Sequence, residues 1–96
     1  MPRSRIERIR EKIRLRQYDM SAHAMEEMDE DKLDVIDVET AIGNGRIART
    51  EKNDPRGTKY IVEGIGSDKQ RAVEVVGRFT SSGRYLIITV YGITRE

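Results

Sequence analysis

The segment Tyr85-Leu86-Ile87-Ile88-Thr89-Val90-Tyr91 decides the fold class, because it is strongly apolar and rich in β-branched and aromatic residues. It predicts a strand over residues 84–92, and its apolar character favours a central position in a sheet. Side chains alternate between the two faces of a strand. We therefore expect helices to cover one face, formed by Leu86, Ile88 and Val90, and expect an open face formed by Tyr85, Ile87, Thr89 and Tyr91.

Three earlier segments show strand patterns and are separated by turn signals. The predicted strands cover residues 46–51, 58–65 and 71–79. The first is weakly apolar and is expected at an edge. The turn Asn53-Asp54-Pro55-Arg56-Gly57 follows it, because proline presets φ and glycine tolerates a positive φ. With the last strand, these segments predict a four-stranded antiparallel sheet.

Helical periodicity precedes the strands. Ser4 is a suitable N-cap for a helix whose stripe of Ile6, Ile9 and Ile13 should lie on the sheet or on a second subunit. Ser21 is expected to cap a short helix over residues 22–30, and Asp34 to cap a third helix. Gly43-Asn44-Gly45 predicts a left-handed C-cap for that third helix. The fold class is therefore α+β, with two to three N-terminal helices on one face of the sheet.

The composition predicts a single small domain. The chain has 96 residues, is 36% charged and contains no cysteine, which excludes disulfides and thiolate metal sites. No apolar run reaches the ~20 residues of a membrane span, so we expect a cytoplasmic protein with no membrane partner. We divide residues 1–96 into a basic N-terminal helix extension, 1–16, and a core, 17–93.

Charge is segregated along the chain, although the net charge is only +1. Residues 1–16 carry seven Lys and Arg against two Glu, whereas residues 19–40 carry nine Asp and Glu against one Lys. The basic helix is able to bind a nucleic acid backbone, but it contains no aromatic residue for base stacking. It is equally able to pair with the acidic helices of the chain.

His23 is the only histidine and falls in the first turn of the helix capped by Ser21. The helix dipole there favours neutral imidazole, which can act in acid–base catalysis. The structural alternative is that His23 bonds a carbonyl or carboxylate and fixes the short helix against the sheet. A metal site formed with Glu26 or Glu27 has little support, and we expect no metal and no cofactor.

Several motifs occur in order along the chain. They are Ser21-x-His23-Ala24, Ala41-Ile42-x-x-Gly45-Arg46-Ile47, Asp54-x-Arg56-Gly57, Tyr60-x-Val62-x-Gly64 and Ile87-Ile88-Thr89-Val90-Tyr91. Over about residues 17–93 the chain resembles the bacterial domain-of-unknown-function 4258 family, which is thought to be related to the RelE/ParE superfamily of toxins. The resemblance implies a RelE/ParE-like fold. It also implies a toxin-type RNA-cleaving or RNA-binding protein, with RNA or the ribosome and a small acidic antitoxin as partners.

If the chain is an enzyme, we expect a metal-independent endoribonuclease. The expected catalytic residues are His23, Tyr60 and Tyr91, and the expected substrate-binding residues are Arg56, Arg78 and Arg84, because RNA cleavage needs proton transfer and a neutralised phosphorane. The chain departs from the family pattern at Glu27 and Asp31, where many members carry arginine. The competing hypothesis is a non-enzymatic interaction module, or a homodimer formed through the first helix.

Overall fold

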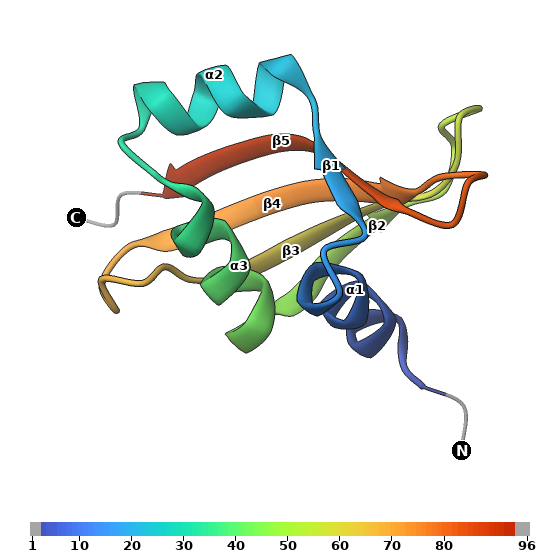
Figure 1. Cartoon of the computed structure of the whole chain (residues 1–96), viewed down its shortest axis with the longest axis horizontal. Helices are drawn as coiled ribbons and strands as arrows, with labels where there is room; N and C mark the ends of the chain where they lie inside the picture. Colours follow the sequence, from blue (N-terminus) through green and yellow to red (C-terminus); the bar gives the residue numbers. More distant parts are fainter. Residues whose placement is uncertain (1–2, 94–96) are drawn as a thin grey trace.

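A computed structural model describes residues 3–93 as three helices and one five-stranded sheet (Figure 1). The predicted α+β class is confirmed, as are the positions of the three helices and the four longer strands to within about two residues. In chain order the elements are α1 (Arg5–Arg14), β1 (Tyr18–Met20), α2 (Ala22–Glu30), α3 (Val35–Asn44), β2 (Arg46–Glu51), β3 (Lys59–Ile65), β4 (Ala72–Phe79) and β5 (Tyr85–Ile93).

The sheet has the order β1-β5-β4-β3-β2, and β1 runs parallel to β5. The prediction of a four-stranded, wholly antiparallel sheet was therefore wrong. The missing strand, β1, has only three residues, and so short a segment has no periodicity to reveal it. The prediction that residues 46–51 form an edge strand is confirmed, because β2 pairs only with β3.

The helices cover one face of the sheet. In Figure 1, α1 and α3 lie in front of the strands and α2 runs along β5. Ile9 of α1, Val38 and Ile42 of α3 and Val75 of β4 are all fully buried in the shared core. The isoleucine stripe of α1 thus packs on the chain's own core. Within residues 3–93, no helix is both long and apolar enough to cross a membrane.

The expected faces of the last strand were only partly right. Tyr85 and Ile87 are fully buried in the core beneath the helices, together with Val90. The register with β4 shifts between Val76 and Gly77, so that Ile88 has no direct partner. A bulge adds one residue to a strand and reverses the alternation beyond it. For this reason Val90 lies on the predicted face, whereas Tyr85 and Ile87 lie on the opposite face from the one predicted.

Strand β5 is not central, as its composition had suggested, but lies between β4 and the short β1. Beyond β1, side chains associated with α2 pair with the exposed edge of β5. Glu27 accepts a hydrogen bond from Val90 N–H (3.2 Å), and Asp31 accepts one from Gly92 N–H (2.8 Å). Helix α2 therefore completes the edge of the sheet. Glu27 and Asp31 both have this structural role.

Helix α3 ends without the predicted left-handed C-cap, since Gly45 has φ −87° and ψ −174°. Glycine is needed there for close approach. A Cβ at Gly45 would lie 2.5 Å from the Ala41 carbonyl oxygen, and one at Gly64 would lie 1.9 Å from it. Asn44 then joins the helix end to β3, because its side-chain amide pairs with both Ile65 N–H and C=O at 2.8 Å.

Candidate nucleic-acid interface

Two arginines of α1 lie over aromatic rings of the sheet. The Cζ atom of Arg5 is 5.6 Å from the ring centroid of Tyr60, and that of Arg8 is 4.9 Å from the ring centroid of Phe79. Both distances are in the range of cation–π contacts. Tyr60 and Phe79 pack edge to face, with centroids 6.0 Å apart. These rings restrain two otherwise exposed guanidinium groups.

Further cations lie at the same end of the sheet. The loops β2–β3 and β4–β5 both project from the right-hand end in Figure 1. Arg78 lies near the end of β4, and a Cβ at Gly57 would be 3.9 Å from its Cδ, so its side chain runs past the β2–β3 turn. We call Arg5, Arg8, Arg78, Tyr60 and Phe79 the basic end of the molecule.

The arginines of the basic end differ from their neighbours in having no ion-pair partner among residues 3–93. Two other predicted binding residues, Arg56 and Arg84, are already engaged. Arg56 Nε lies 3.4 Å from Asp54 Oδ1, and Arg84 Nε lies 2.8 Å from Asp19 Oδ2. The hydrogen bond from Arg84 lowers the pKa of Asp19. This contact also ties β1 to the start of β5.

Tyr91 lies in a different cluster, on the face of the sheet that the helices leave open. Its hydroxyl donates to Glu74 Oε1 at 2.5 Å, and Arg49 Nη2 donates to the same oxygen at 3.1 Å. The Glu74 side chain is almost fully buried. The hydrogen bond to Glu74 raises the pKa of Tyr91, so this phenol stays protonated at neutral pH. The hydrogen bonds from Tyr91 and Arg49 thus satisfy the buried carboxylate of Glu74.

His23 contacts the acidic side chain that closes the sheet edge. Its Nε2 lies 3.2 Å from Glu27 Oε1, the same oxygen that accepts from Val90 N–H. The imidazole is 65% exposed. Ser21, the N-cap of α2, bonds Ala24 N–H through its hydroxyl and also donates to the Ile88 carbonyl. The contacts of His23 are those of the structural alternative, in which it supports α2 against the sheet.

The residues expected to be catalytic thus occupy three surfaces. His23 lies on α2, Tyr60 is buried beneath α1, and Tyr91 lies on the open face. The structure instead brings Tyr60 together with Arg5, and Phe79 together with Arg8, whereas Arg78 pairs with Leu86 on the face of the sheet away from these rings. The sequence did not predict that Arg5 and Arg8 contact aromatic rings, because Tyr60 and Phe79 are more than fifty residues away from them along the chain. Residues 3–93 contain no cluster of three metal-ligating side chains.

The basic end combines the features that single-stranded nucleic acid requires. Guanidinium forks contact phosphate oxygens in pairs, and their flat faces stack on bases. Aromatic rings beneath the arginines restrain these side chains before a ligand arrives, which reduces the entropy lost on binding. Arg5 and Arg8 thus offer groups that can contact phosphate oxygens and flat faces that can stack on bases.

A comparison with protein families gives one match. A family model with the description Domain of unknown function (DUF4258) matches residues 20–92. No curated protein and no solved structure gives a significant match. The match begins after α1, so Arg5 and Arg8 lie outside the part of the chain that the family model covers.

Proposed function

The chain belongs to the DUF4258 family, and we propose that it binds single-stranded RNA through the basic end. The observation that carries this proposal is the pair of arginine–aromatic contacts, Arg5 over Tyr60 and Arg8 over Phe79. Arg78 adds a third guanidinium without an ion-pair partner among residues 3–93. Arg5 and Arg8 offer anion-binding groups with flat stacking faces on the helix side, and Arg78 lies at the same end on the other face of the sheet.

RNA is favoured over duplex DNA on two grounds. The chain resembles a family that is thought to be related to the RelE/ParE superfamily, whose members include toxins that cleave messenger RNA. In addition, the flat faces of the arginines that lie over these rings suit unstacked bases, which single strands supply and duplexes do not. The proposal is binding without cleavage, because His23, Tyr60 and Tyr91 do not share a site.

The test is fluorescence anisotropy with a labelled twelve-nucleotide single-stranded RNA. The variant Arg5→Gln/Arg8→Gln should weaken binding by about tenfold or more, since one stacked base contributes about 1–3 kcal/mol. The control is Lys69→Gln, which removes one exposed charge from the β3–β4 loop. It should change the affinity less than twofold. Circular dichroism should show that both variants keep the fold.

Equal weakening per removed charge by the control and by the α1 variant would contradict the proposal, because binding would then follow net charge alone. The RNA should also be recovered intact after incubation. Cleavage that is lost in His23→Ala would overturn the statement that the chain binds without cleaving. It would restore the catalytic role that the sequence suggested for His23.

A further inference from the structure

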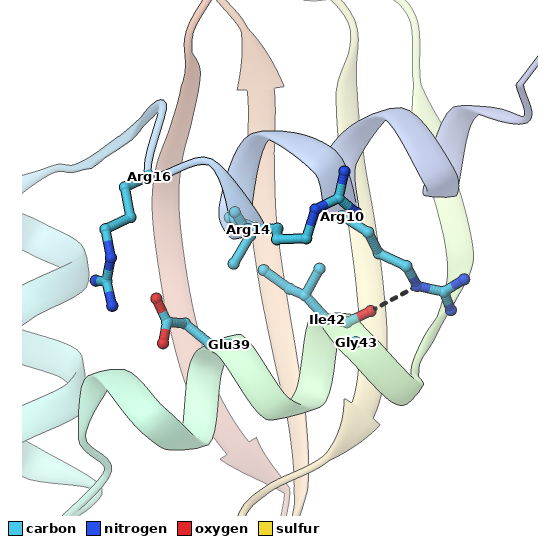
Figure 2. A pocket seen from close by; sticks show the side chains of 7 residues that line it. Arg10, Arg14, Arg16, Glu39, Ile42 and Gly43 are labelled. Atoms are coloured by element: carbon cyan, nitrogen blue, oxygen red, sulfur yellow. Dashed lines mark hydrogen bonds between the residues drawn. The ribbon is translucent and has the colours of Figure 1, made fainter.

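A second basic site lies between α1 and α3, on the half of α1 away from Arg5 and Arg8. A hollow of about 410 Å³ opens there, a size suited to a small organic ligand. Its floor is apolar, and three guanidinium groups and one carboxylate surround it (Figure 2). The residues that line it include Arg10, Ile13, Arg14, Arg16, Glu39 and Ile42.

Arg16 has an unusual backbone conformation for its residue type. It has φ 58°, and it follows the C-cap Leu15 of α1. Gln17 N–H bonds the Lys12 carbonyl and Arg16 N–H bonds the Ile13 carbonyl, which is the pattern of a Schellman motif. Glycine usually occupies this left-handed position, since a Cβ is unfavourable there. Arg16 therefore places a long side chain at a position where the backbone conformation favours glycine.

That side chain points toward the carboxylate of Glu39 (Figure 2), yet the two form no ion pair. Glu39 is held from the other side by Tyr18, whose hydroxyl donates to Oε2 at 2.8 Å. Burial and this carboxylate raise the pKa of Tyr18 to about 12, so the phenol remains a donor at neutral pH. The carboxylate keeps acceptor capacity that faces the hollow.

Arg10 fixes the opposite side of the hollow. Its Nε donates to the Ile42 carbonyl at 3.1 Å, and its Nη2 donates to the Gly45 carbonyl at 2.7 Å. These bonds satisfy carbonyl groups at the C-terminal end of α3 and orient the guanidinium. Arg14, by contrast, is exposed and has no ion-pair partner among residues 3–93. Two free guanidinium groups, Arg14 and Arg16, thus border the same hollow.

We propose that this hollow binds a small phosphorylated sugar. Arg16 takes the phosphate, since guanidinium forks match phosphate oxygens, and Arg14 borders the opposite side of the hollow beside Arg10 (Figure 2). Glu39 accepts hydrogen bonds from the sugar hydroxyls, as carboxylates do for ribose. The apolar floor of Ile13 and Ile42 contacts the carbon face of the ring. This site is separate from the basic end, and the inference does not rest on RNA binding.

The test uses the full chain, labelled with ¹⁵N, and titration with ribose 5-phosphate, ribose and inorganic phosphate. Ribose 5-phosphate should give saturable shifts of the amide signals of Arg14, Arg16 and Gly43. Its affinity should exceed that of inorganic phosphate at least tenfold, and ribose alone should give no shifts. Absence of saturable shifts with ribose 5-phosphate, or equal affinity for inorganic phosphate, would overturn the proposal.

Arg16→Gly separates binding from structure, because glycine suits the left-handed position. This variant should keep or raise the thermal midpoint and weaken ribose 5-phosphate binding at least tenfold. Glu39→Gln should retain phosphate binding and lose the preference for the sugar. The matched control Lys69→Gln should bind as the unmodified chain does. Unchanged affinity in Arg16→Gly, or tenfold weakening in Lys69→Gln, would contradict the assignment.

Discussion

At the scale of single residues, Tyr85 shows the cost of filling the core with a polar side chain. Its ring is fully buried and stacks edge to face on Phe79, with centroids 5.2 Å apart. The hydroxyl has no hydrogen-bond partner among residues 3–93, and burial raises the pKa of the phenol. Gly77 leaves room for it, since a Cβ there would lie 2.5 Å from Tyr85 Cε2.

Tyr85→Phe should therefore stabilise the chain. The substitution keeps the packed ring and removes a buried, unsatisfied hydroxyl, whose burial costs about 1–3 kcal/mol. We expect the free energy of unfolding in urea to rise by about 1 kcal/mol. The control Tyr18→Phe, which loses the bond to Glu39, should lower it instead. A loss of stability in Tyr85→Phe would show that the hydroxyl has a partner after all.

Asp37 provides a pH-dependent contribution to stability. Its Oδ1 accepts bonds from Ser67 Oγ and, at 2.9 Å, from Ser67 N–H, and its Oδ2 accepts one from Asp34 N–H. The Ser67 hydroxyl is the largest cause of the lowered pKa of Asp37. A carboxyl whose folded pKa lies below its unfolded value of about 3.9 stabilises the fold above that pH. The contribution is lost as the pH falls through the folded pKa.

Asp37→Asn should therefore lower the free energy of unfolding at pH 7 and reduce its fall between about pH 4 and pH 2. Urea unfolding across this range measures both effects. Asp29 is exposed, and Asp29→Asn serves as the control. It should leave the fall in the free energy of unfolding at low pH unchanged. Parallel pH curves for the unmodified chain and Asp37→Asn would contradict this account.

At the scale of elements, α2 acts as a cover for the edge of β5. The carboxylate of Glu27 accepts from Val90 N–H, a bond that a neighbouring strand would otherwise provide. Glu27→Ala should cost about 1–3 kcal/mol, because it leaves this amide without an acceptor. Hydrogen exchange of Val90 N–H should accelerate in the same variant. Equal exchange in Glu27→Ala and in the exposed control Glu26→Ala would show that the edge needs no such cover.

The elements also show where sequence patterns suffice and where they fail. The caps Ser4, Ser21 and Asp34 predicted three helix starts correctly, because capping is a local interaction. The alternating pattern of β5 predicted the wrong face for Tyr85. The pattern is interrupted by a bulge near Gly77, and this bulge arises from the pairing with β4, which a single segment does not reveal. Strand β1 was missed because parallel pairing with β5 joins residues that are 67 apart in the chain.

At the scale of the whole molecule, α1 completes the core although it lies outside the family match. Ile9 is fully buried and Ile13 nearly so, and Arg10 bonds the end of α3. Deleting residues 1–16 should therefore lower the free energy of unfolding by about 3–6 kcal/mol, since each of the two buried isoleucines contributes about 1.5–3 kcal/mol. A truncated chain with an unchanged thermal midpoint would mean that α1 is an independent extension, as the sequence division at residue 16 implied.

The candidate site emerges only at this scale. The charge of residues 1–16 indicated nucleic-acid binding, but the lack of aromatic residues there weakened that prediction. The fold supplies the rings from β3 and β4, and Phe79 lies directly beneath Arg8. Contacts between segments so far apart depend on topology, which local patterns do not report. The same topology separates His23 from Tyr60 and Tyr91.

The most direct test of the RNA-binding proposal is the salt dependence of RNA affinity. For single strands, each phosphate contact contributes about 0.7 to the slope of log K against log salt concentration. The variant Arg5→Gln/Arg8→Gln/Arg78→Gln should therefore flatten the slope by about 2 relative to the unmodified chain. An unchanged slope, or no binding by the unmodified chain at low salt, would contradict the account.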